Sequence, residues 1–115
     1  MAQWDTAFGQ DKPGIAYLFC RETIEAGSSF HARMFAPRLG VPEDPATGAG
    51  AAAFSGVYLH FQHPPDGDHE LSIEQGYEMG RPSLIGLSLT VRNRRLAAAA
   101  ISGDAIVVSE GKIEA

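Results

Sequence analysis

The sequence predicts an α+β domain in which a mixed, barrel-like β-sheet wraps around one central apolar helix. Two observations predict it. A long stretch between Asp44 and Asp66 carries no formal charge and has helical character, and the segments on both sides alternate apolar and polar residues as strands do. With 115 residues and 44% hydrophobic content, the chain suits one core, so we expect residues 1–115 to form a single domain.

Two strands are expected before the helix. Residues 1–13 are polar and contain Gly9 and Pro13, which predicts an irregular N-terminal segment. The apolar run Ile15–Cys20 predicts a buried strand, and Phe30–Ala36 predicts a second one ending at a proline. Polar residues 22–29 should form the loop between them, and the Gly and Pro content of residues 37–43 predicts an irregular approach to the helix.

The central helix is expected from Gly48 to about Phe61. Its apolar residues point in nearly every direction of a 3.6-residue wheel, which is typical of a helix that is covered on all sides. Pro64 and Pro65 end it, and Asp66 with the following glycine forms a turn.

Only strand patterns follow this turn. Residues 71–74 and 87–91 alternate apolar and polar side chains. Residues 96–100 (LAAAA) have helical propensity but are too few to predict a helix with certainty. Ile101 has strand character, residues 102–104 predict a turn, and Ala105–Val108 predicts a last strand.

Composition excludes several classes of function. A net charge of −5 argues against nucleic-acid binding. Cys20 is the single cysteine, so an internal disulfide and a C-x-x-C site are excluded, and its apolar surroundings predict a small core residue rather than a nucleophile. No signal-peptide pattern or 18-residue apolar span is present, and we expect a cytoplasmic protein with no membrane partner.

The start of the central helix carries the best candidate site. Pro45 disfavours helical torsions at Asp44 and keeps this acid just outside the helix. Thr47 is the expected N-cap, and the small residues of Gly48–Gly50 let a ligand approach the first-turn N–H groups. An anion site with a carboxylate beside it suits proton transfer on a substrate carboxylate, with Asp44 as the catalytic group. The alternative is that these residues form only a turn, a cap and a packing contact.

Two other groups of side chains are candidates for ligand binding. Arg81 either directs its guanidinium toward a substrate anion or pairs with an acid such as Glu78. A cluster of polar residues after the helix could be read as a metal site, but solvated side chains are the better interpretation, and no metal is expected. The cluster consists of His60, His63, Asp66, Asp68 and His69.

Three motifs resemble one protein family. They are RMFAPRLGVPEDPATGAGAAAFSGVYL (Arg33 to Leu59), IEQGYEMGRPSLI (Ile73 to Ile85) and ISGDAIVVSEGKI (Ile101 to Ile113). In this order and spacing they are similar to the C-terminal half of the PhzF family, the isomerases of phenazine biosynthesis and their relatives. The resemblance implies a diaminopimelate-epimerase-like fold of two similar halves, each a barrel-like sheet around a central helix, with the active site between them.

The resemblance also implies a function. Family members move a proton and a double bond in a carboxylate-bearing substrate without metal or organic cofactor. Asp44 is the matching catalytic residue, and Thr47, Gly48, Ala49, Gly50 and Arg81 are the matching substrate-binding candidates. Ala49 stands where the family usually has serine, and no segment matches the N-terminal half that carries the family's glutamate base and assisting histidine.

The expectation is therefore half of an isomerase cleft that lacks its general base. The competing interpretation is a non-catalytic binding or interaction module. In either case we expect the uncovered face to associate with a second copy, as a homodimer, or with a separate N-terminal half.

Overall fold

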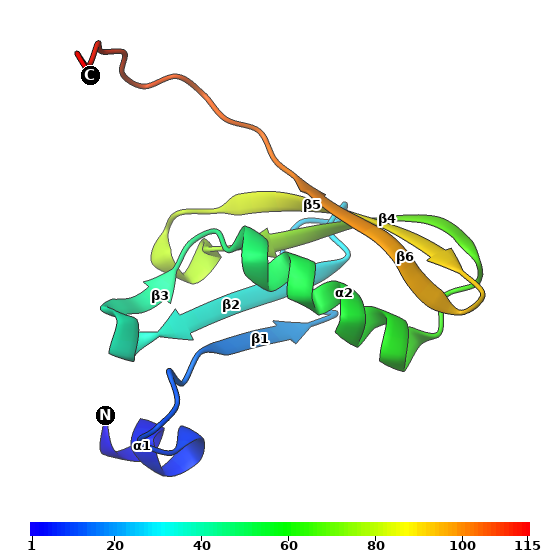
Figure 1. The fold of residues 1–115 in the computed structure, drawn as a ribbon, viewed down its shortest axis with the longest axis horizontal. Coiled ribbons are helices and arrows are strands. Elements are labelled where there is room, and N and C mark those ends of the chain that lie inside the picture. Colours follow the sequence, from blue (N-terminus) through cyan, green and yellow to red (C-terminus); the bar gives the residue numbers. More distant parts are fainter.

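The computed structural model describes residues 1–115 and shows one six-stranded mixed sheet with two α-helices (Figure 1). This confirms the α+β class. The strands follow the order β1-β2-β4-β5-β6, with β3 paired to β2 off this path. The elements are α1 (Ala2–Phe8), β1 (Ala16–Cys20), β2 (Phe30–Ala36), the 3-10 turn η1 (Pro37–Leu39), β3 (Val41–Asp44), α2 (Gly48–Gln62), β4 (Gly67–Gln75), the 3-10 turn η2 (Tyr77–Met79), β5 (Ser83–Arg92) and β6 (Arg95–Ser102).

One crossover organises the sheet. β2 and β4 are parallel neighbours, with Phe30 opposite Ile73, and the chain between them contains β3 and α2. All other pairs are antiparallel. A parallel pair needs such a crossover, and here it lays α2 against the sheet (Figure 1). No helix in the structure is long and apolar enough to cross a membrane.

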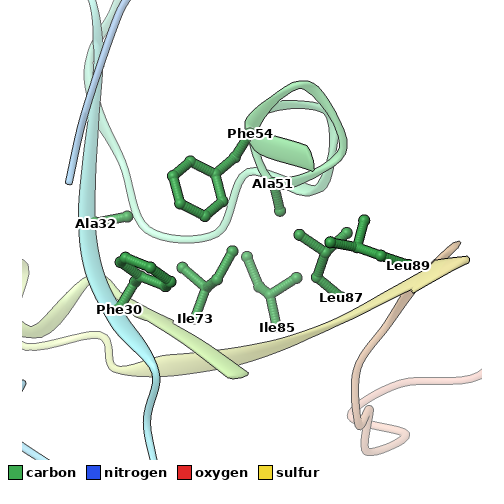
Figure 2. Packing of buried hydrophobic residues seen from close by; sticks show 8 residues of the cluster. All are labelled: Phe30, Ala32, Ala51, Phe54, Ile73, Ile85, Leu87 and Leu89. Carbon is green, nitrogen blue, oxygen red and sulfur yellow. The ribbon is translucent and has the colours of Figure 1, made fainter. Parts of the chain in front are cut away.

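The core lies between α2 and the middle strands. Figure 2 shows Ala51 and Phe54 of α2 pointing at side chains from β2, β4 and β5. The cluster consists of Phe30, Ala32, Ala51, Phe54, Ile73, Ile85, Leu87 and Leu89. Only 15 of 115 residues are buried, which is few for this length and shows that much apolar surface stays uncovered.

α2 is enclosed on one side only, so the expectation of a helix covered all round is wrong. Its buried residues are Ala51, Phe54 and Ser55, which form a single stripe at helical spacing. On the opposite side Ala52 and Ala53 are exposed, as is Phe61. The apolar composition of this face is therefore not explained by packing within the chain.

The outer strands close around the first turn of α2. A Cβ placed at Gly48 would lie 2.6 Å from Cδ1 of Ile101 in β6, and one at Gly50 would lie 2.7 Å from the ring of Tyr17 in β1. Strands from both ends of the sheet thus reach the same helix terminus. The sheet is curved around this end of α2, as the barrel-like prediction required.

Three predictions about the N-terminal region are wrong. Residues 1–13 are not irregular throughout, because α1 forms there. The ring centroids of Trp4 and Phe8 lie 4.7 Å apart, and the Trp4 indole N–H donates to the Gly14 carbonyl at 2.9 Å. The strand at residues 15–20 exists, but β1 is an outer strand with exposed residues rather than a buried one. Cys20 is consequently exposed, not a core residue, and its thiol donates to the Glu22 carbonyl at 3.3 Å.

Three further stretches differ from expectation. Residues 41–44 are not irregular but form β3, because they pair with β2. The alanine-rich residues 96–100 belong to β6, which pairs along β5 through a turn at Asn93 and Arg94 with positive φ values of 52° and 63°. Ala105–Val108 forms no strand: after Ser102 the chain is extended and exposed, without a partner.

Candidate active site at the start of α2

Gln75 connects the two central motifs. Its side chain is fully buried, and its amide Nε2 donates to the backbone carbonyl of Asp44 at 2.7 Å and to the Thr47 hydroxyl at 2.9 Å. Its Oε1 accepts from the Thr47 N–H at 3.2 Å. Gln75, the last residue of β4, therefore fixes the loop that carries Asp44, because both the N–H₂ and the oxygen of its side-chain amide bond to that loop.

The Thr47 hydroxyl does not cap α2. Thr47 occupies the N-cap position with φ −120° and ψ 90°, but its side chain makes no capping bond and donates instead to Oδ2 of Asp44 at 2.6 Å. This corrects the expected N-cap role. It produces a chain of hydrogen bonds from Gln75 through Thr47 to Asp44, which orients the half-buried carboxylate.

Because the Thr47 hydroxyl bonds to Asp44, backbone N–H groups in the first turn of α2 have no hydrogen-bond acceptor. The N–H groups of Ala49 and Gly50 have no hydrogen-bond partner, whereas the N–H of Ala51 bonds to the Thr47 carbonyl at 3.1 Å. Free N–H groups at a helix start, together with the helix dipole, favour an anion. Asp44 and these donors thus lie at the same end of α2.

Gly76 lets the second motif pack against the first. It has φ of 87°, and a Cβ there would lie 2.2 Å from the Arg81 carbonyl oxygen and 2.7 Å from that of Pro45. Only glycine fits such a position. Ser83 adds a bond from its hydroxyl to the same Pro45 carbonyl at 2.9 Å. The turn from residue 76 to 83 is thereby held against the Asp44–Pro45 loop.

Arg81 is exposed and forms no ion pair. Its backbone N–H donates to the Gly76 carbonyl at 2.9 Å, which fixes the turn but leaves the guanidinium unengaged. The alternative pairing with Glu78 is wrong, because Glu78 contacts His31 and lies 3.9 Å from Arg33.

A groove of about 370 Å³ runs from the start of α2 along its exposed side. Most of its lining comes from β1 and α2, with one residue from β2, and eight of its ten lining residues are apolar. Thr47, Ala49 and Gly50 line one end, so the predicted substrate-binding positions border a largely apolar hollow. The other lining residues are Ile15, Tyr17, Phe19, Met34, Ala53, Phe54 and Val57.

A charged cluster supports the loops behind the site. The carboxylate of Glu74 is fully buried and accepts from the N–H groups of Ile24 and Glu25 at 2.9 to 3.1 Å and from His31 Nδ1 at 2.5 Å. The other ring nitrogen of His31 contacts Glu78. Burial alone would raise the pKa of Glu74, but these hydrogen bonds outweigh it and lower the pKa to about 2. Burial alone would lower the pKa of His31, and its two carboxylate partners instead raise it above 6.5.

These opposite shifts predict the pH dependence of stability. Ionised Glu74 stabilises the fold above its ordinary pKa of 4.5, and this contribution is lost as the pH falls toward 2. Protonated His31 stabilises the fold below 6.5, and its contribution is lost as the pH rises through the raised pKa. We therefore expect the free energy of unfolding, measured in urea, to be largest between pH 4.5 and pH 6.5.

The matched variants are His31→Gln and His69→Gln. The first should abolish the decrease on the alkaline side. The second, at a half-buried histidine that bonds to the Pro65 carbonyl and to no carboxylate, should leave the profile unchanged. An unchanged alkaline decrease in His31→Gln would show that another group causes it.

The two aspartates of the alternative metal cluster bond to other groups of the chain. The Asp66 carboxylate accepts from the N–H groups of Asn93 and Arg94 at 2.8 and 3.0 Å, and Asp68 accepts from Thr90. No three His, Cys, Asp or Glu side chains of the structure are grouped as a metal site.

Residues 7–111 match the family model for PhzC-PhzF, described as phenazine biosynthesis-like protein. The chain belongs to this family. It is 54% identical over 97 residues to an uncharacterised isomerase of Mesorhizobium japonicum, covering 84% of this chain and 32% of that protein. It is 34% identical over 87 residues to trans-2,3-dihydro-3-hydroxyanthranilate isomerase of Pseudomonas aeruginosa, covering 76% and 31%.

A solved structure has a similar fold. The fold is similar to that of the PhzF-family phenazine biosynthesis protein of Bacillus anthracis, with a TM-score of 0.65 and 24% identity over 77% of this chain and 33% of that one. The chain therefore spans about a third of the length of the relatives it matches.

Sequence reasoning missed the residues that position the site. Gln75, Ser83 and Glu74 lie in or beside the quoted second motif but had no assigned role. A glutamine next to a glycine, at the end of a strand with alternating apolar residues, was the available signal for Gln75. Its partners lie 28 and 31 residues earlier, which a local pattern does not identify.

Proposed function

We propose that this PhzC-PhzF chain is an isomerase domain that forms one side of a cleft for a small carboxylate-bearing substrate. The observation that carries the proposal is the conjunction of Asp44, oriented through Thr47 by the buried Gln75, with free N–H groups on Ala49 and Gly50. It is supported by the isomerase names of the relatives. A cytoplasmic site of action is part of the proposal.

Each predicted residue has a role in this proposal. The N–H groups of Gly48, Ala49 and Gly50 bind the substrate carboxylate, and Arg81 supplies a second positive group from the neighbouring turn. Asp44 transfers a proton at the adjacent carbon, and the apolar groove receives the body of the substrate. Proton transfer and double-bond movement need no cofactor here.

The proposed general base comes from outside this chain. An isomerisation that moves a proton needs an acceptor and a donor, and Asp44 provides one of them. We propose that a glutamate of an N-terminal half completes the pair. Ala49, in place of the usual serine, leaves its backbone N–H available but removes a hydroxyl contact, so the substrate need not be that of the phenazine isomerases.

Binding at the helix start can be measured directly on the isolated chain. Titration with 3-hydroxyanthranilate, followed by the amide signals in two-dimensional NMR, should shift Ala49 and Gly50 saturably and leave the distant Gly9 and Gly111 unchanged. Thr47→Val, which removes the hydroxyl that orients Asp44, should leave the Ala49 and Gly50 shifts in place. Signals that stay unchanged at Ala49 and Gly50 up to millimolar ligand would contradict the proposed carboxylate site.

A second candidate function is an interaction module. The exposed apolar side of α2 and the low number of buried residues favour it, because such faces are usually covered by association. We propose that the chain self-associates or pairs with a separate N-terminal half. Light scattering should then give a mass above the 12.2 kDa of one chain.

A further inference from the structure

One edge of the sheet is open beside the apolar groove. β1 pairs with β2 on one side and with no strand on the other, although it lines the groove along α2. Tyr17 and Phe19 of β1 face α2, with the Phe19 and Phe54 rings 4.7 Å apart, and Leu18 between them is 57% exposed on the opposite face. An added strand would therefore meet apolar side chains on both faces.

The C-terminal segment has the composition of such a strand. Ile106, Val107 and Val108 are β-branched and each 87% exposed, and Ile113 is 96% exposed. The segment projects away from the sheet on the side opposite β1 (Figure 1). Consecutive β-branched residues favour an extended conformation. While they are exposed to water, the favourable free energy of burying their apolar surface is not gained.

We propose that the C-terminal segment of a second copy of this chain inserts beside β1, as an added strand that covers the groove. This proposal rests on the second candidate function above, self-association through the uncovered face. The surface is the free edge of β1 with the groove beside it, and the occupant is the C-terminal segment of the second copy. Strand addition satisfies the free backbone groups of β1 and buries the side chains of the inserted segment.

The side-chain pattern matches this insertion. Alternation along a strand places Ile106 and Val108 on one face and Val107 on the other. Ile106 and Val108 would lie in the groove against Tyr17, Phe19 and Ala53, and Val107 would pack beside Leu18. Three apolar residues in succession are unusual for a solvated tail but suit an edge that is apolar on both faces.

A second copy fits better than the segment's own chain. β6 and β1 are the two outer strands, and the segment leaves β6 next to Gly48, so reaching its own β1 would take it across the start of α2. In the structure it extends outward instead. Reciprocal insertion between two copies gives a closed symmetric dimer in which both grooves are filled.

Two pairs of variants test the surface. The wild-type chain should have about twice the 12.2 kDa mass by light scattering, and Ile106→Asp with Val108→Asp should return it to one chain. These side chains are exposed, so the variant leaves the fold of the single chain intact, as circular dichroism can verify. Ala53→Arg in the groove should also give a monomer, while Ala52→Arg, exposed on α2 but outside the groove, should leave the dimer.

Cross-linking identifies the occupant. One chain carries Cys20→Ser and Ser109→Cys. The other chain is tagged and keeps Cys20, the exposed thiol at the end of β1. The two chains are mixed and treated with a short thiol cross-linker. A product containing one of each chain is expected, and a control with Ala115→Cys in place of Ser109→Cys should give much less of it. In a chain that carries both Cys20 and Ser109→Cys, the cross-link can also form within one molecule. A cross-linked product with the mass of a single chain would overturn the exchange between copies.

The outcomes separate the two proposals. A dimer that is insensitive to the Ile106 and Val108 substitutions overturns the inserted segment but keeps self-association. A monomer at all concentrations overturns both, and the amide titration at Ala49 and Gly50 still tests the isomerase proposal independently.

Discussion

Gly76→Ala is expected to lower the free energy of unfolding by about 4 kcal/mol, from left-handed strain and overpacking together. The φ of 87° disfavours any residue with a Cβ, and the new methyl would lie 2.2 and 2.7 Å from the carbonyl oxygens of Arg81 and Pro45. Both are backbone atoms in the two site motifs, so the clash cannot be relieved by rotating a side chain. Urea unfolding followed by circular dichroism measures the loss.

Gly80→Ala is the matched control. Gly80 has a similar φ of 68°, but a Cβ there would have nothing within 4 Å. It should cost only about 1 kcal/mol, the strain of a left-handed alanine alone. Equal losses at the two positions would show that the contact between the motifs does not hold the turn.

Gln75→Met is expected to destabilise the chain by about 3 kcal/mol and to disorder the Asp44 loop. The volume is nearly kept, so no cavity forms, but the Asp44 carbonyl and the Thr47 N–H lose their buried partner. Urea unfolding gives the magnitude, and hydrogen exchange at Thr47 gives the location. Protection of that amide should fall more than that of the core strands.

The control for Gln75→Met is Gln10→Met. Gln10 is exposed and has no hydrogen-bond partner, so the same substitution there should change stability by less than about 0.5 kcal/mol. A loss at Gln75 no larger than this would mean that the buried amide is not what fixes the loop.

Local sequence patterns predicted the elements whose hydrophobic periodicity matches their burial in the fold. The helix expected from Gly48 to Phe61 is α2, and the alternating residues of β4 and β5 place Ile73, Leu87 and Leu89 in the core. In these segments the hydrophobic periodicity and the intrinsic secondary-structure propensity favour the same structure. α1 and β6 were missed because their partners are distant: Trp4 needs Gly14, and the alanines of β6 need β5.

The position of the candidate site residues at the start of α2 was predictable from the sequence, their roles stay a proposal, and the contacts that support them were not predictable. Asp44 and the small residues after Thr47 could be identified because Pro45 and the glycines have local conformational meaning. That the Thr47 hydroxyl bonds to Asp44 rather than capping α2 depends on Gln75, which only the fold brings close. The apolar wheel of α2 predicted a helix covered on all sides, but in the structure Ala52, Ala53 and Phe61 stay exposed.

The central claim is that Asp44 transfers a proton to a bound carboxylate substrate once the other half of the cleft is present. The most direct test replaces the matching 87-residue stretch of the Pseudomonas aeruginosa isomerase with the corresponding residues of this chain. It then measures deuterium incorporation from heavy water into trans-2,3-dihydro-3-hydroxyanthranilate. We predict incorporation by the graft, a loss of about 10²-fold or more in its Asp44→Asn variant, and none by the isolated chain. Full exchange in the Asp44→Asn graft, or exchange by the isolated chain, would contradict the account.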